Sequence, residues 1–106
     1  MTDQSTLGAR IKLAMAAFAV RQPGKRTSHA AYGAAVASVE GVQPYAADTV
    51  YDWLCNAAVP SYATMGAIAE LAGRATDAQL GQLLYGDEQA IHGLNEADYR
   101  RFHRVG

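Results

Sequence analysis

TVYDWLCNAAVPS, which spans Thr49–Ser61, contains the only tryptophan of the chain, Trp53. Val50, Trp53 and Leu54 are spaced so that one face of a short helix is apolar. Asn56 can adopt the left-handed conformation that ends such a helix. We therefore predict that Trp53 anchors the core from a short helix whose other face is offered to a partner.

The composition favours a single all-α domain. The chain has 106 residues, 22 of which are alanine and three proline, and 50% of its residues are hydrophobic. Alanine is the strongest helix former, and this length suits one domain. The longest apolar run, Leu13 to Val20, is too short for a bilayer, so we expect no membrane span. The single cysteine, Cys55, excludes an internal disulfide and favours a cytoplasmic location.

Apolar spacing and capping residues predict five helices and a helical C-terminal extension. The expected ranges are about 6–20, 29–39, 46–55, 61–72 and 77–84, with a further helix over 95–104. We expect one domain over residues 1–86 and an extension over 87–106. Tyr32, Val36 and Val39 should share one buried face, and Trp53 should pack against Ile11, Val36, Val39 and Ile68.

The net charge of −1 conceals an uneven distribution. Residues 1–29 carry five basic residues and one acidic residue, residues 30–99 carry one basic and nine acidic, and residues 100–106 carry three basic. The basic charge therefore lies near the two ends of the chain. It forms a patch only if the fold brings these ends together.

Several short motifs share one register. The chain reads Leu7-Gly-Ala-Arg-Ile11, then Ala37-x-x-x-Gly41, then Thr49-Val-x-x-Trp53, followed by Pro60, Ile68-Ala69 and Gly73. This pattern resembles the phage-repressor or Cro-type (lambda-repressor-like, xenobiotic-response-element) helix-turn-helix family over about residues 7–84. The resemblance implies a compact five-helix fold and binding to double-stranded DNA.

The chain departs from the family pattern in and after the turn. Thr49 follows Gly41 by eight positions instead of five, so the turn is about three residues longer. Leu54 replaces the glutamate after the tryptophan, and Asn56 replaces a glycine. Two alanines, at 57 and 58, stand where the family has a basic pair, and this substitution removes expected phosphate contacts.

Two sets of residues are candidates for DNA contacts. Cationic side chains and a helix N-terminus suit phosphate, and the expected residues are Arg21, Lys25, Arg26, Ser28 and His29. The alternative for this set is a solvated loop. The outward face of the helix over 46–55, with the turn before it, is expected to read bases through Tyr45, Ala47, Asp48, Thr49, Tyr51 and Asp52. This face has no Arg, Lys, Asn or Gln, so its alternative is a solvated helix face or a protein-contact surface.

The remaining apolar residues predict self-association. A set after Gly73 exceeds the needs of a five-helix core, and regulators of this kind usually pair on a two-fold site. The expected dimer residues are Leu80, Leu83, Leu84, Ile91, Leu94, Tyr99 and Phe102. The three histidines are scattered, and no nucleophile motif or phosphate-cradling glycine loop is present, so we expect no metal, no cofactor and no enzyme activity.

The sequence thus predicts a sequence-specific DNA-binding transcriptional regulator, repressor-like and of phage or prophage type. The alternative is a protein-interaction module, such as an antitoxin-like domain that binds a partner protein through the same fold.

Overall fold

Six helices make up the secondary structure of the residues that the computed structural model describes, which are 6–21, 27–73, 76–86 and 93–103. They are α1 (Leu7–Val20), α2 (His29–Glu40), α3 (Ala47–Leu54), α4 (Tyr62–Leu71), α5 (Asp77–Tyr85) and α6 (Glu96–His103). The all-α prediction is confirmed, and each helix lies within two residues of its expected bounds. The described residues form six helices where the resemblance implied a five-helix fold, because the helix expected in the C-terminal extension, α6, packs on the domain.

Helix ends lie at residues whose chemistry favours them. Thr6, Ser28 and Ser61 each precede a helix and accept a hydrogen bond from a backbone N–H three residues later. Gly41 ends α2 with a φ of +80°, and Asn56 follows α3 with a φ of +61°. Both adopt the left-handed conformation, which glycine and asparagine tolerate best.

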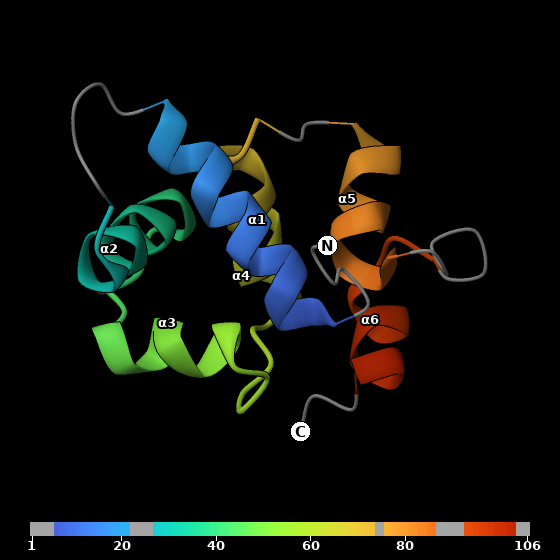
Figure 1. Ribbon diagram of the computed structural model, residues 1–106. Coiled ribbons are helices and arrows are strands. Elements are labelled where there is room, and N and C mark those ends of the chain that lie inside the picture. Colours follow the sequence, from blue (N-terminus) through green and yellow to red (C-terminus); the bar gives the residue numbers. More distant parts are fainter. Residues whose placement is uncertain (1–5, 22–26, 74–75, 87–92, 104–106) are drawn as a thin grey trace.

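Two helices form a central layer, and one pair of helices lies on each side of it. In Figure 1, α1 crosses in front of α4, with α2 and α3 on one side and α5 and α6 on the other. Each outer pair packs on the central helices: α2 on α4 and α3 on α1, α5 on both α1 and α4, and α6 on α4. None of the helices in the described ranges combines the length and apolar character that a membrane span requires.

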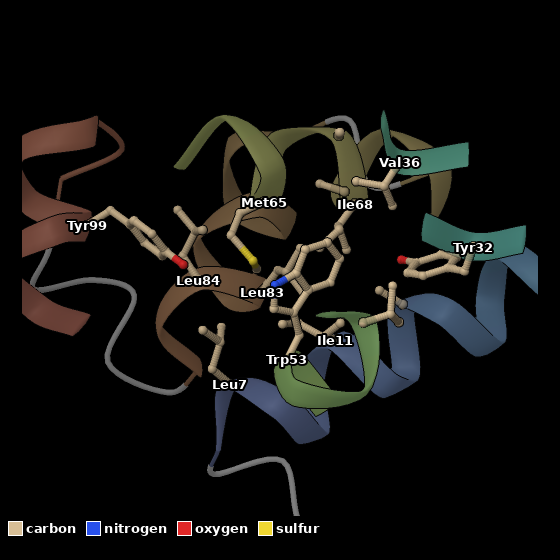
Figure 2. Close-up of a cluster of buried hydrophobic side chains, with 14 of the residues drawn as sticks. Leu7, Ile11, Tyr32, Val36, Trp53, Met65, Ile68, Leu83, Leu84 and Tyr99 are labelled. Atoms are coloured by element: carbon tan, nitrogen blue, oxygen red, sulfur yellow. The ribbon is translucent and has the colours of Figure 1, made fainter. Parts of the chain in front are cut away.

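Trp53 occupies the middle of the core, as predicted. It is 4% exposed, and Figure 2 shows its indole among Ile11, Met65, Ile68 and Leu83. The expected contact with Val39 is wrong, because this side chain is 39% exposed. Val39 lies in the last turn of α2 and is not part of the core cluster.

Two contacts bind α1 to distant parts of the chain. The Gly8 N–H donates to Asn56 Oδ1 over 2.8 Å, and a Cβ atom on Gly8 would lie 2.5 Å from the Leu54 carbonyl oxygen. Arg10 is 4% exposed; its Nε donates to the Leu83 carbonyl over 2.8 Å and its Nη2 to the Leu84 carbonyl over 3.2 Å. The L-G-x-R-I segment therefore fixes α1 against both outer pairs.

Candidate nucleic-acid interface

The residues of α3 that were predicted from the sequence to face outward do lie at the surface. Ala47, Asp48, Tyr51 and Asp52 are exposed, and Thr49 is half-buried at the edge of the face. This orientation follows from the helical repeat, because Val50 and Trp53 are buried on the opposite side. The helix is therefore amphipathic, with one face in the core and one facing solvent.

The N-terminus of α2 lies beside this face. The His29 and Tyr51 rings have centroids 6.1 Å apart and are tilted by 37°. Ser28, the residue before His29, caps α2 by accepting a hydrogen bond from the Ala31 N–H over 3.1 Å. One of the predicted phosphate contacts, His29, is thus brought next to a residue predicted to read bases.

The side chains of the α3 face mainly accept hydrogen bonds. Asp48 and Asp52 carry carboxylates, and among the described residues neither takes part in an ion pair. A side-chain hydrogen bond with Cys55 raises the pKa of the Tyr51 phenol. A phenol is protonated at neutral pH even at its ordinary value, so this side chain has a proton to donate. Cys55 itself is an exposed free thiol. The face can accept from a donor such as the amino group of cytosine, and its phenol can donate.

Arg21 does not join this surface. Its Nη1 donates to the Leu71 carbonyl over 3.1 Å, so the guanidinium caps the C-terminal end of α4. The expectation that Arg21 contacts phosphate is not supported by this position. Lys25 and Arg26 lie outside the described residues.

Tyr45 points into the protein rather than outward. Its hydroxyl donates to Glu40 Oε2 over 2.6 Å and lies 3.2 Å from Thr64 Oγ1, and its ring packs edge-on against Trp53 with centroids 5.1 Å apart. Burial and the hydrogen bond to Glu40 raise the pKa of this phenol. The predicted role of Tyr45 in base contact is therefore corrected: the residue holds the turn in place.

The turn packs closely on Gly33, a contact that sequence reasoning missed. A Cβ atom on Gly33 would lie 2.5 Å from the Tyr45 carbonyl oxygen and 3.1 Å from Val50 Cγ2. The resemblance had drawn attention to Ala37, which is buried one helical turn later. The sequence does contain a signal for this contact, which is the glycine four residues before Ala37. A glycine within a helix can indicate that another backbone segment approaches closely, because a Cβ atom would prevent the contact.

Most of the predicted dimer residues lie inside the single chain. Leu83, Leu84 and Tyr99 have no exposed surface, and Leu80 and Phe102 are partly buried against the core. Leu94 is 36% exposed, and Ile91 lies outside the described residues. The apolar residues after Gly73 therefore complete the core of one chain, and those three are not available to a second copy.

No three side chains of the His, Cys, Asp or Glu type come together as a metal site in the described part of the chain. Comparison with known proteins gives no match to a family model, to a curated protein or to a solved structure.

Proposed function

We propose that this chain binds double-stranded DNA sequence-specifically and acts as a cytoplasmic, repressor-like transcriptional regulator of phage or prophage type. The observation that carries the proposal is the contact between His29 and Tyr51, with centroids 6.1 Å apart. It puts the N-terminus of one helix and the solvent-facing side of the next on one surface. A helix-turn-helix uses these two parts together, the first on phosphate and the second on bases.

The start of α2 suits a phosphate group. The N–H groups of a first helical turn and the positive end of the helix dipole favour anions. Ser28 satisfies one of these N–H groups, that of Ala31, and His29 is half-buried beside it. Lys25 and Arg26 precede this helix in the sequence, and the proposal assigns phosphate contacts to both.

The start of α3 suits the major groove. Ala47 is small and exposed, and therefore permits a close approach of the backbone to base edges. Asp48, in the first turn, only accepts hydrogen bonds, so it favours the amino group of cytosine. Thr49, Tyr51 and Asp52 extend the contact along the helix. A homodimer on a two-fold site belongs to the same proposal, with Leu94 as its exposed apolar candidate.

A protein-interaction module is the second candidate, and the acidity of α3 favours it. Asp48 and Asp52 would repel phosphate, and α3 has no arginine, lysine, asparagine or glutamine. A basic segment of a partner protein would complement this face. The same helices would then form a binding surface of an antitoxin-like domain.

The test is a binding selection from random duplexes with the full chain, followed by gel shifts at several salt concentrations. A regulator enriches one sequence, and its affinity falls steeply with salt because phosphate contacts release counterions. His29→Ala should weaken binding to all sequences. Glu70→Ala, which removes an exposed carboxylate from α4, serves as the control and should change nothing.

Failure to enrich any sequence, together with no gel shift at low salt, would overturn the DNA-binding proposal. A protein partner whose binding is lost in Asp48→Ala and Asp52→Ala, with no affinity for any duplex, would establish the second candidate instead.

A further inference from the structure

The segment between α2 and α3 is exposed at three successive residues. Val42, Gln43 and Pro44 all face solvent, while Tyr45 turns into the protein. This segment contains the additional residues by which the turn exceeds the family pattern. An insertion at the edge of a binding surface changes what that surface can touch.

The backbone of this segment is fixed at both ends. At its start, the N–H groups of Gly41 and Val42 both donate to the Ala37 carbonyl, over 2.8 and 3.0 Å. At its end, the Tyr45 carbonyl rests on Gly33, where a Cβ atom would come within 2.5 Å. The exposed residues between these points are therefore held by the fold and are not part of a long free loop.

Tyr45 adds a side-chain anchor to the same segment. Its hydroxyl contacts Glu40 at the end of α2 and Thr64 in α4. Thr64 in turn donates to the second oxygen of Glu40 over 2.9 Å, and Ser61 Oγ lies 2.9 Å from Thr64 Oγ1. This network links the turn to α2 and α4, so these helices fix the position of the turn that contains Gln43.

Gln43 has a side-chain amide, a group that no residue of α3 has. Between Thr27 and Leu54 it is the only residue with a side-chain amide, which both donates and accepts hydrogen bonds. A glutamine pairs in bidentate fashion with adenine, accepting from N6 and donating to N7. Asp48 cannot make this contact, because a carboxylate has no proton to donate to N7.

We propose that Gln43 is a specificity-determining residue that recognises an adenine in the major groove, next to the bases contacted by α3. This inference rests on the proposed DNA-binding function. Gln43 precedes Asp48 by five residues, which span at most about 17 Å of extended chain. Base pairs are about 3.4 Å apart along the helix axis. The adenine therefore lies within about five base pairs of the position that Asp48 contacts.

The experiment compares the wild-type chain with Gln43→Ala and Gln43→Glu on a panel of single-base variants of the selected site. We expect both substitutions to reduce discrimination at one A·T pair by about 5- to 150-fold, the equivalent of one bidentate contact. Gln82→Ala, which removes an amide from α5, is the matched control and should leave the preference unchanged.

Tyr45→Phe tests whether the turn positions Gln43. It removes the hydroxyl and keeps the ring against Trp53. Discrimination should fall at the same A·T pair and be retained at the base pair that Asp48 contacts. A merely structural role would weaken binding at all positions equally.

The outcomes separate this inference from the function on which it rests. If the wild-type chain selects a site and Gln43→Ala keeps the full preference at every position, the role of Gln43 is refuted and DNA binding stands. If the wild-type chain selects no site, both proposals fail together.

Discussion

The α2–α3 pair and the α5–α6 pair flank the same two central helices (Figure 1). Tyrosine hydroxyls hold both pairs. In the second pair the Tyr99 hydroxyl donates to the Pro60 carbonyl over 2.7 Å, and the Tyr85 hydroxyl donates to the Gly93 carbonyl over 2.8 Å. In the first pair the Tyr45 hydroxyl donates to Glu40. The two pairs are thus fixed to the domain by similar chemistry.

The pairs differ in what they leave exposed. On α6, Glu96 lies 3.5 Å from Arg100 and Asp98 lies 3.4 Å from Arg101, so the exposed charges are paired along the helix. On α3, neither Asp48 nor its neighbour Asp52 has such a partner in the described part of the molecule. Burial in the core and ion pairs along the helix explain the residues found on α5 and α6. Neither explains the exposed residues of the α3 face, which is therefore the surface to test for function.

The largest expected effect is on the core that both pairs share. Trp53→Ala should lower the free energy of unfolding by about 3–5 kcal/mol, because it leaves a cavity under α3. This loss is comparable to the whole stability of a small domain. Tyr51→Ala, on the exposed side of the same helix, should change stability by about 0.5 kcal/mol or less. Equal melting temperatures for the two variants would contradict the assigned orientation of α3.

The next test concerns the turn of the first pair. Gly33→Ala should destabilise by about 1–3 kcal/mol, because the new methyl group meets the Tyr45 carbonyl oxygen at 2.5 Å. Gly66→Ala in α4 is the matched control, since nothing lies within 4 Å of its Cβ position. It should stabilise by about 0.5–1 kcal/mol through helix propensity. Denaturation curves of the two variants should therefore shift in opposite directions.

The second pair is tested through its buried phenol. Tyr99→Phe removes the hydrogen bond to Pro60 and should cost about 1–3 kcal/mol at neutral pH. Burial raises the pKa of Tyr99 above its usual value of about 10. The folded phenol therefore stays protonated where the unfolded one ionises, and the free energy of unfolding falls as the pH rises above about 10.

The phenylalanine variant lacks this contribution, so its stability should fall less steeply in alkaline solution. Tyr45 and Tyr85 also have raised pKa values, so a smaller slope remains. Parallel curves of stability against pH for the wild type and the variant would show that Tyr99 is not the buried group responsible.

We expect the smallest effect on stability from a substitution on the α3 face. Asp48→Ala should leave the melting temperature almost unchanged, because Asp48 is exposed and has no ion-pair partner among the residues that the structure describes. On DNA it should remove about 1–3 kcal/mol of discrimination at one base pair. Affinity for unrelated sequences should rise slightly, since a negative charge near phosphate is lost. A base preference identical to that of the wild type at every position would rule out direct contact by Asp48.

The helices were predictable because their ends are marked locally. Ser28, Ser61 and Gly41 act on backbone groups within a few residues, so their effect can be inferred without knowledge of the fold. The exposed side of α3 was predictable for a related reason. The periodicity of Val50 and Trp53 fixes the direction of every other side chain on that helix.

The remaining features depend on contacts between distant residues. Tyr45 lies in a connector, where no helical repeat indicates its direction, and its partner Thr64 is 19 residues away. Leu83 and Leu84 were assigned to a dimer because their apolar surface had no visible partner. The packing of α5 on α1 and α4, together with the docking of α6 on α4, accounts for that surface within one chain.

The burial of Arg10 has a consequence for synthesis on the ribosome. This residue is made before its acceptor at Leu83, which follows 73 residues later. A guanidinium withdrawn from water before those carbonyls exist would carry a large desolvation cost. We therefore expect the nascent helix α1 to keep this side chain hydrated until α5 has emerged and supplies the carbonyl groups that accept from it.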